Sequence, residues 1–361
     1  MQTKDIQGMK MSAQLSQLAT KFRGTLLGAL IGDCFGSPFE GEINVSKSVL
    51  KKYVSNLLVE QSTGTLQIYS YTDDTAMSRC LAESLLESNG FNAKDLAKRF
   101  TVEYYKQPRR GYGANVVDVF ARLRVTNYED PFGPAKTQFG GSGSYGNGSA
   151  MRIAPVALFG YSLSADKLIE LVRNTSLITH AHRDGYNGAI LQCLAIHQAL
   201  HLQGDTTAFN SKEYINSLID SMEKIERSDN NDEDMPFTEK LNHIKKILEN
   251  LNDDNDLSPQ QIAYLIGHGV SATSSVPTAI YAFLRAQKPI KDFETDNKFV
   301  RTVYLAISIG GDTDTIASMA CSIAGSFYGV SEIPEIFIRR CESNEVVTKL
   351  ADDLYAKTTS N

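Results

Sequence analysis

Helical periodicity runs along almost all of this chain of 361 residues. Strand-like alternation of apolar and polar residues is rare, so the sequence predicts an all-α fold with irregular glycine-rich loops between the helices. Ser258, followed by Pro259 and Gln261, marks one helix start with an N-cap, a proline at the first helical position and a capping-box glutamine. Apolar residues recur at spacings of three and four near residues 12–35, 74–88, 94–106, 113–124, 164–175, 185–203, 211–226, 237–250, 258–272, 276–287, 298–309 and 314–328.

The first of these helices carries a glycine at every fourth position, namely Gly24, Gly28, Gly32 and Gly36. On a helix such glycines share one face and let a second backbone approach closely. The apolar run 25–39 is interrupted by Asp33 and is shorter than the ~20 residues that cross a membrane. We therefore predict tight helix packing, with no membrane partner. Pro38 should end the helix and leave Glu40 on a loop.

Composition excludes several classes of protein. Hydrophobic residues make up 42% of the chain and charged residues 22%, which is typical of a globular protein with a sizeable core. The formal net charge of -6 gives no basic footprint, so we expect no direct binding of nucleic acid. The first 24 residues lack the apolar core of a signal peptide. We predict a flexible segment over 1–19 and a single domain over 20–357, and nothing indicates a state other than a monomer.

Five cysteines are scattered along the chain without a CxxC pair, which disfavours zinc held by cysteine and predicts reduced thiols in an intracellular compartment. The acidic stretches 228–236 and 251–259 are predicted to be solvated connections.

Two short acidic clusters stand out, YTDDT at 71–75 and GGDTDT at 310–315. Aspartates one or two positions apart do not share a helix face, so each pair suits a turn just before the apolar helix that follows it. Capping of that helix is the simpler interpretation, since Asp and Thr are common N-caps. A cap needs only one acceptor, however, and each cluster offers two carboxylates.

Together the clusters offer only oxygen ligands, which suits Mg²⁺ first and Mn²⁺ or Ca²⁺ next. Four carboxylates in one place would repel one another unless a cation neutralised them, and two metal ions roughly 3.5–4 Å apart would allow bridging carboxylates. We predict that the clusters meet in space and hold metal. The ligands offered are Thr72, Asp73, Asp74, Asp312, Asp314 and Thr315.

The glycine-rich stretch 139–152 is a second candidate site. Backbone N–H groups in such a loop can hold a pyrophosphate, although a plain surface turn is the alternative. The stretch is neither a Walker loop nor a dinucleotide-binding fingerprint. Phe139 and Tyr145 flank its glycines and could stack on a nucleobase. His180 is a candidate for a substrate contact, against a packed or capping role, and the two histidines His180 and His182 do not by themselves define a zinc site.

Seven motifs, found in the same order over about residues 20–330, resemble the ADP-ribosylglycohydrolase family. Their detailed sequence is closer to the vertebrate serine-directed member of that family than to the arginine-directed one. The motifs are FRGTLLGALIGDCFGSPFE, YTDDTAM, GYGANVVDVF, GSYGNGSAMR, THAHRDGYNGA, SVPTAIYAFLRA and SIGGDTDTIASMACSIAG. The resemblance implies a compact orthogonal helical fold around a binuclear Mg²⁺ site. It adds Glu40 to the metal ligands above. It also implies substrate binding by Asp73, Phe139, Gly143, Ser144, Tyr145, Gly146, Asn147, His180 and Val270.

By the same resemblance Glu40 would be the mobile catalytic carboxylate that activates water or moves a proton, and Asp314 the catalytic residue that bridges the metal ions. The implied reaction is Mg²⁺-dependent hydrolysis of O-glycosidic ADP-ribose linkages on protein serine residues, and also in poly(ADP-ribose) and O-acetyl-ADP-ribose. ADP-ribose would be the product, and ADP-ribosylated proteins the partners. The alternatives are hydrolysis of ADP-ribosylarginine and a catalytically silent binding or structural relative. The expected location is the nucleus and cytoplasm, with the mitochondrial matrix left open.

Overall fold

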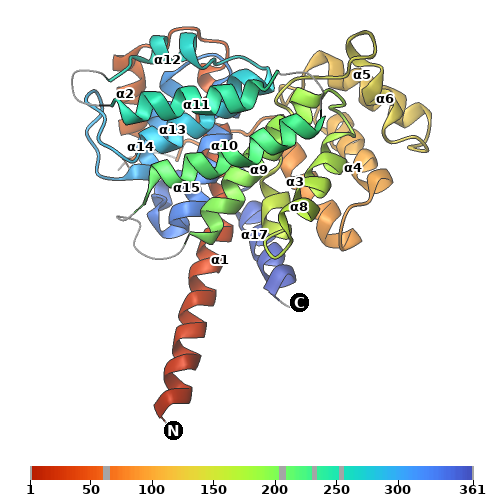
Figure 1. The fold of residues 1–361 in the computed structure, drawn as a ribbon. Coiled ribbons are helices and arrows are strands. Elements are labelled where there is room, and N and C mark those ends of the chain that lie inside the picture. Colours follow the sequence, from red (N-terminus) through yellow and green to blue (C-terminus); the bar gives the residue numbers. More distant parts are fainter. Residues whose placement is uncertain (1, 60–65, 203–208, 230–233, 252–255, 360–361) are drawn as a thin grey trace.

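A computed structural model describes residues 2–59, 66–202, 209–229, 234–251 and 256–359, with the backbone alone for 2–16. Over these residues the chain forms helices and no strand, and its β pairing is limited to isolated bridges such as Tyr69 with Cys341. The predicted all-α fold is confirmed (Figure 1). The helices are α1 Gln2–Gly36, α2 Lys47–Leu57, α3 Asp73–Ser88, α4 Ala93–Lys106, α5 Ala114–Val125, α6 Gly133–Lys136, α7 Ala154–Phe159, α8 Ala165–Ser176, α9 Arg183–His201, α10 Ser211–Asp229, α11 Pro236–Glu249, α12 Pro259–Leu265, α13 Ala272–Arg285, α14 Lys298–Ser308, α15 Thr313–Tyr328, α16 Glu335–Arg339 and α17 Asn344–Thr359.

The observed helices differ from the predicted ones in several places. The segment predicted as one helix over 258–272 is instead α12 followed by a turn and the start of α13, because Gly267 adopts a left-handed φ of 118°. The capping box at Ser258 is confirmed. The helix α1 begins at Gln2 instead of near residue 12 and runs through residue 19, so the predicted boundary at 19–20 stays a prediction. The helices α2, α6, α7, α16 and α17 were not predicted.

The glycine face of α1 packs antiparallel against α15, as the spacing predicts. A Cβ added to Gly28 would lie 2.9 Å from the carbonyl carbon of Cys321, and one added to Gly36 would lie 2.6 Å from the Cα of Asp314. Gly24 meets Gly325 and Gly32 meets Ala317 in the same register. Only glycine allows backbones this close. The packing brings the C-terminal end of α1 beside the N-terminal end of α15, where the Thr313 hydroxyl donates to the Gly36 carbonyl at 2.9 Å.

The remaining helices surround this pair. Helices α9, α13 and α14 pack on α15, while α3 packs on α4 and α17 packs on α1 and α3. Figure 1 shows α4, α5 and α6 on one side of the molecule, and α11, α13 and α14 on the other. No helix among the described residues is long and apolar enough to cross a membrane.

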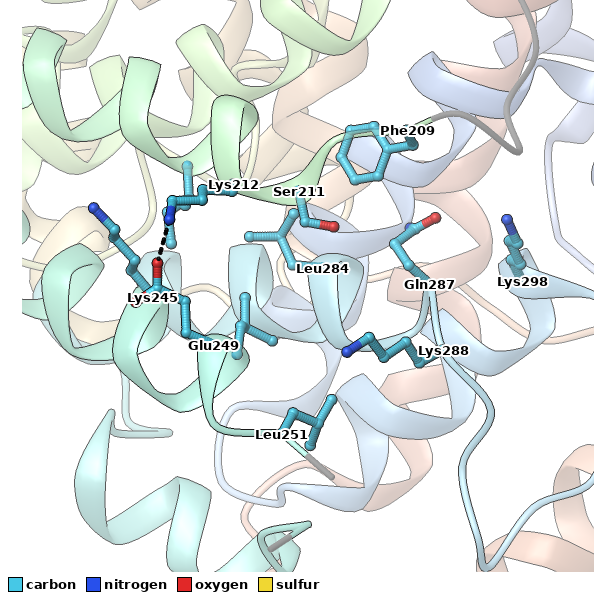
Figure 2. A pocket seen from close by; sticks show the side chains of 12 residues that line it. Phe209, Ser211, Lys212, Lys245, Glu249, Leu251, Leu284, Gln287, Lys288 and Lys298 are labelled. Carbon is cyan, nitrogen blue, oxygen red and sulfur yellow. Dashed lines mark ion pairs between the residues drawn. The ribbon is translucent and has the colours of Figure 1, made fainter. Parts of the chain in front are cut away.

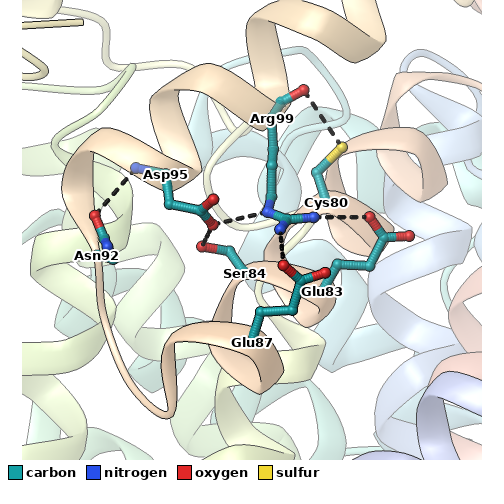
Figure 3. Close-up of polar contacts among 7 residues, drawn as sticks. All are labelled: Cys80, Glu83, Ser84, Glu87, Asn92, Asp95 and Arg99. Carbon is teal, nitrogen blue, oxygen red and sulfur yellow. Dashed lines mark hydrogen bonds and ion pairs between the residues drawn. The ribbon is translucent and has the colours of Figure 1, made fainter.

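Figure 3 shows how α4 holds α3, the helix that begins with Asp73. Arg99 on α4 donates to Asp95 at 2.7 Å and to Glu87 at 2.5 Å, and lies 3.4 Å from Glu83. Glu83 and Glu87 belong to α3, so one guanidinium joins the two helices. Its side chain is only 21% exposed, which limits screening by solvent.

Arg99→Ala should therefore lower the free energy of unfolding by about 1 kcal/mol, because three carboxylates would lose their shared cation. Urea unfolding measures this change, and high salt should reduce it. Arg122→Ala is the control. Arg122 is 52% exposed and forms an exposed ion pair along its own helix with Asp118 and an exposed hydrogen bond to the Thr137 hydroxyl at 3.2 Å, so its loss should change stability little. Equal effects of both substitutions would contradict the assigned role of Arg99.

Of the described acids in the two acidic stretches, Asp229 and Asp256 are less solvated than predicted, whereas Asp234 is exposed as predicted. Asp229 is almost buried and pairs with Arg173 at 2.8 Å, and Asp234 pairs with Arg183 at 2.6 Å. Asp256 accepts from the buried Arg285 at 2.5 and 3.0 Å. These aspartates are not free surface charges, because each lies against an arginine from another segment of the chain. Residues 230–233 and 252–255 of the two stretches lie outside the described residues.

Candidate metal centre

The two acidic clusters meet at the N-terminal ends of α3 and α15. The Thr315 hydroxyl donates to Asp74 Oδ1 at 3.2 Å, across 241 positions of sequence. Carboxylate oxygens of Glu40, Asp312 and Asp314 all lie within 4.8 Å of one another. Glu40 is exposed, whereas Asp312 and Asp314 are buried. The predicted convergence is therefore observed, and these three residues form a group that could hold a metal ion.

The side chains of Asp73, Asp74 and Asp314 lie in the first helical turns themselves, slightly beyond the preceding turn that the sequence predicts. They do little capping. Thr72 caps α3 by accepting from the Asp74 N–H at 3.3 Å. Asp312 occupies the N-cap position of α15, but its side chain makes no cap hydrogen bond. Capping thus accounts for one threonine and leaves the four aspartate carboxylates to be explained.

Glu40 reaches this centre because its loop is hydrogen-bonded to the turn before α15. The Gly41 N–H donates to the Gly311 carbonyl at 2.9 Å, and the Gly311 N–H donates to the Glu42 carbonyl at 2.8 Å. Gly311 has a φ of 75°, and a Cβ there would collide with the backbone of His268. Glycine at this position therefore permits both the left-handed backbone and the close contact.

Asp33 is a site residue that the sequence analysis noted only as an interruption in an apolar run. Its buried carboxylate accepts from the Thr72 N–H at 2.9 Å, the Thr75 N–H at 3.0 Å and the Thr75 hydroxyl at 2.5 Å. It therefore fixes the start of α3 relative to α1. The signal that could have found it is a lone acid within a glycine-striped apolar helix, where burial without partners would be costly.

Burial and mutual repulsion dominate the electrostatics of the cluster. Burial, followed by the charge of Asp33, raises the pKa of Asp73 to about 8 and that of Asp74 well above its ordinary value. Burial and then Asp312 raise the pKa of Asp314 and of Glu40. Asp74 Oδ2 is buried and has no hydrogen-bond partner among the described residues. An orphan oxygen within an oxygen-only set of acids fits a hard divalent cation, which would lower all these pKa values.

The protein should lose stability as pH rises when metal is absent. Burial raises the pKa of Asp33 to about 6 and that of Asp73 to about 8, against roughly 3.9 in an unfolded chain. The folded protein thus keeps protons that the unfolded chain releases from about pH 4 to about pH 8, so its free energy of unfolding falls across that interval. Melting in chelator at several pH values tests this. Asp33→Asn should remove the lower part of the slope and reduce the upper part, because the charge of Asp33 also raises the pKa of Asp73. A melting temperature that rises with pH in chelator would contradict the prediction.

The glycine-rich stretch lies directly beside the acidic cluster. The Asn147 side-chain amide donates to Asp312 Oδ2 at 2.5 Å. The loop is held by an Asn147 N–H bond to the Val270 carbonyl at 2.9 Å and an Ala272 N–H bond to the Tyr145 carbonyl at 3.0 Å. Gly146 pairs with Ser271 in the same bridge. Val270 contributes its backbone to this contact, and its side chain is exposed.

Phe139 and Tyr145 lie together at the outer end of this loop, with ring centroids 5.2 Å apart and planes inclined by 43°. A base stacked between two rings needs them roughly 7 Å apart, twice the usual contact distance. The rings would therefore have to separate and turn before they could enclose an adenine. Both side chains are exposed, so the surrounding packing permits this movement.

His180 is buried under the loop and is neutral at physiological pH, because burial lowers its pKa to about 3. It can serve a substrate as a hydrogen-bond donor but not as a cation. Its Nδ1 lies 2.7 Å from the Thr179 hydroxyl. The Thr179 hydroxyl accepts a hydrogen bond from Arg152 at 2.8 Å, which favours donation of the hydroxyl proton to His180 Nδ1. The ring proton of the neutral His180 is then on Nε2. A Cβ at Gly148 would lie 3.1 Å from Nε2, so this ring nitrogen faces the glycine-rich loop.

Arg152 is a second residue that the sequence analysis did not select. It is fully buried, and burial lowers its pKa to about 9 while Asp73 opposes that shift. It donates to the Gly148 carbonyl at 3.0 Å and lies over the Phe100 ring at 4.6 Å. Through its hydrogen bond to Gly148, Arg152 thus holds the glycine-rich loop from the buried side. The sequence shows it only as the end of the motif GSYGNGSAMR.

An open cleft of about 700 Å³ adjoins Glu40 and Thr72. Its opposite wall is the segment 107–111, which covers Asp73 through an Asp73 N–H bond to the Arg110 carbonyl at 2.6 Å. The glycine-rich loop contacts the acidic cluster through Asp312, and this cleft adjoins it through Thr72 and Glu40. A substrate could therefore extend from the cluster in both directions.

The fold and this site define a helical protein with a carboxylate cluster suited to a divalent cation. The chain matches the model of the ADP-ribosylglycohydrolase family over residues 14–361. It is 44% identical to ADP-ribosylhydrolase ARH3 of Xenopus tropicalis, over 87% of this chain and 89% of that protein. It is 41% identical to ADP-ribosylhydrolase ARH3 of Homo sapiens, over 93% of each. The chain belongs to the ADP-ribosylglycohydrolase family.

A solved structure described as an ADP-ribosylglycohydrolase-related protein complex shares the fold. It has a TM-score of 0.64 at 21% identity and covers 95% of this chain and 99% of that one.

Proposed function

We propose that this protein is a Mg²⁺-dependent hydrolase that removes ADP-ribose from serine residues of proteins by cleaving the O-glycosidic bond. We extend the proposal to poly(ADP-ribose) and O-acetyl-ADP-ribose, whose linkages are also through oxygen. The observation that carries it is the meeting of residues 71–75, residues 310–315 and Glu40 in one cluster. Relatives named ADP-ribosylhydrolase ARH3, 41–44% identical over most of the chain, support hydrolysis of ADP-ribose linkages, and the choice of serine rests on the resemblance of the sequence motifs.

The residues that would hold two Mg²⁺ ions are Glu40, Thr72, Asp73, Asp74, Asp312, Asp314 and Thr315. Bound Mg²⁺ supplies Lewis acidity at the ribose and neutralises the carboxylates. The Asp74 oxygen that lacks a hydrogen-bond partner supports this assignment, since a cation would complete its coordination. Asp314, buried between Asp312 and Glu40, is the proposed bridging residue.

The chain's own groups would orient the substrate. The diphosphate and adjacent ribose would lie against Gly143, Ser144, Gly146 and Asn147, with the neutral His180 donating a hydrogen bond. Phe139 and Tyr145 would separate to receive the adenine. This arrangement is supported by the Asn147 bond to Asp312, which ties the glycine-rich loop to the cluster.

Glu40 is the proposed proton-transfer group. Glycosidic cleavage passes through an oxocarbenium-like state in which the leaving oxygen gains a proton and water loses one. Glu40 lies at the exposed edge of the cluster and lines the open cleft, so its carboxylate has access to water and to the departing serine oxygen. The acceptor protein would occupy the cleft side, away from the glycine-rich loop.

The test measures release of ADP-ribose from a serine-modified peptide and from an arginine-modified peptide, each in Mg²⁺ and in chelator. We expect Mg²⁺-dependent release from the serine peptide alone. Release from the arginine peptide alone would keep the metal centre and overturn the serine assignment. Binding of ADP-ribose without release from either peptide would identify a silent binding protein.

A further inference from the structure

A second cavity lies away from the acidic cluster, between the start of α10, the end of α11, the end of α13 and the start of α14 (Figure 2). Its volume is about 280 Å³. Its apolar wall contains Phe209, Ile215, Leu248, Leu251 and Leu284. Apolar residues from three segments, the start of α10, the end of α11 and the end of α13, thus line this space.

Lysines surround this apolar wall. Lys212, Lys245, Lys288 and Lys298 all line the cavity, against one acid, Glu249. Glu249 lies 3.2 Å from Lys212, so it neutralises only that lysine. The ammonium groups of the other three have no ion-pair partner within the described part of the chain. Among the described residues that line the cavity, cations therefore outnumber acids, in a protein of net charge -6.

We propose that this cavity binds a small amphipathic anion, meaning an alkyl or acyl chain that ends in a phosphate or carboxylate. The alkyl or acyl chain would cover the apolar wall, which is favourable because apolar surface is removed from water. The head group would meet the lysines. Figure 2 shows Lys288 reaching between Leu284 and Leu251, so the cation lies next to the apolar surface. An inorganic anion would leave the apolar wall uncovered, and an uncharged chain would leave the lysines unpaired.

The volume sets the length of the chain. At roughly 30 Å³ for each water-sized group, the cavity holds about nine such groups. A chain of about eight to ten carbons therefore fits, with its head group at the lysines. Much longer chains would have to leave the cavity through its open side.

The cavity and the acidic cluster lie at opposite ends of two helices. Helix α13 begins at Ala272, which bonds the glycine-rich loop, and ends at Arg285 beside the cavity. Helix α14 begins at Lys298 in the cavity wall and ends just before the Gly310–Gly311 turn of the metal centre. Each of these helices has more than ten residues, so about 15–20 Å separates the sites. The proposal therefore does not depend on the catalytic assignment.

Calorimetric titration of the full chain with decyl phosphate, below the concentration that forms micelles, tests the proposal. We expect saturable binding of one molecule per chain, at least about tenfold tighter than decanol or inorganic phosphate. Decanoate distinguishes the head groups, and saturable binding of either anion supports the site. Saturation by hexadecyl phosphate as tight as by decyl phosphate would contradict the size limit.

The matched variants are Lys288→Glu with Lys298→Glu, against Lys106→Glu with Lys167→Glu on the distant α4 and α8. Both pairs change the net charge equally. We expect the first pair to weaken decyl phosphate at least about tenfold and the second to leave it unchanged. Equal effects of the two pairs, no saturable binding, or binding of an acidic peptide in place of decyl phosphate would overturn the proposal. Melting curves establish that each variant is folded.

Discussion

Asp74→Asn is expected to raise the melting temperature of the protein in chelator and to remove the stabilisation that Mg²⁺ confers. Asp74 is buried, its pKa is well above the ordinary value, and its Oδ2 has no partner among the described residues. An amide of the same shape removes a costly buried acid from the metal-free protein. It also removes a proposed ligand, so the two conditions should change in opposite directions.

For the native protein, Mg²⁺ at a hundred times its dissociation constant should add about 2.7 kcal/mol of stability. Asp74→Asn should lose most of that increment, and hydrolysis should fall by about 100-fold or more, equivalent to about 2.7 kcal/mol in the barrier. Melting without Mg²⁺ gives the stability of the metal-free protein, and melting with Mg²⁺ gives the stabilisation by the metal. Release of ADP-ribose from the serine peptide gives the rate of hydrolysis. Asp220→Asn, at an exposed site on α10, is the matched control and should change none of them.

Glu40→Gln provides the contrast that separates metal binding from proton transfer. Hydrolysis should be abolished, while most of the stabilisation by Mg²⁺ remains, because the buried aspartates are retained. If Glu40→Gln lost the Mg²⁺ effect as completely as Asp74→Asn, the loss of metal would account for the loss of hydrolysis, and the proposed role of Glu40 in proton transfer would lose its support.

Gly32→Ala should destabilise the protein by about 3 kcal/mol, which is large for the addition of one methyl group. The added Cβ would collide with the backbone of Ala317 and lie 2.4 Å or less from its nearest atoms on α15. Helix propensity alone predicts the opposite sign, since alanine is favoured over glycine in a helix by about 1 kcal/mol. A decrease in the free energy of unfolding would therefore be evidence of the close packing, and an increase would be evidence against it.

Urea unfolding of the metal-free protein measures this effect, and Gly269→Ala is the control because nothing lies within 4 Å of a Cβ at that position. Activity should fall together with stability, because α1 also carries Asp33 and leads to Glu40. If Gly32→Ala stabilised the protein, the backbones of α1 and α15 could not be as close at this position as the structure places them.

The acidic cluster was predictable because its signal is local. Two carboxylates with neighbouring hydroxyls exceed what helix capping needs, and that excess could be counted at 71–75 and again at 310–315. The glycine spacing likewise predicted a close helix contact, although it could not name α15 as the partner. Partner choice depends on tertiary packing, which a repeat of four residues does not encode.

Asp33 and Arg152 were missed for a different reason. Both are buried polar groups whose partners are distant in sequence. The lone acid in an apolar helix is the one local signal for Asp33, and no neighbouring residue indicates the role of Arg152. Helices α2 and α17 did carry a signal. Leu50, Val54 and Leu57 are buried at helical spacing on α2, and Val347, Leu350 and Leu354 are buried on α17. The spacing of three and four between apolar residues, which predicts the other helices, is present in α2 and α17 as well.

The contact between Gly36 and Thr313 joins residues that are 277 positions apart in the chain. During synthesis at about 5–20 residues per second, α1 leaves the ribosome roughly 15–55 s before the start of α15 is made. Its glycine groove and the apolar residues beside it have no native partner during that time. Chaperones that bind exposed apolar helices are expected to hold the nascent chain until α15 emerges, and chains truncated before residue 313 should aggregate instead of folding in part.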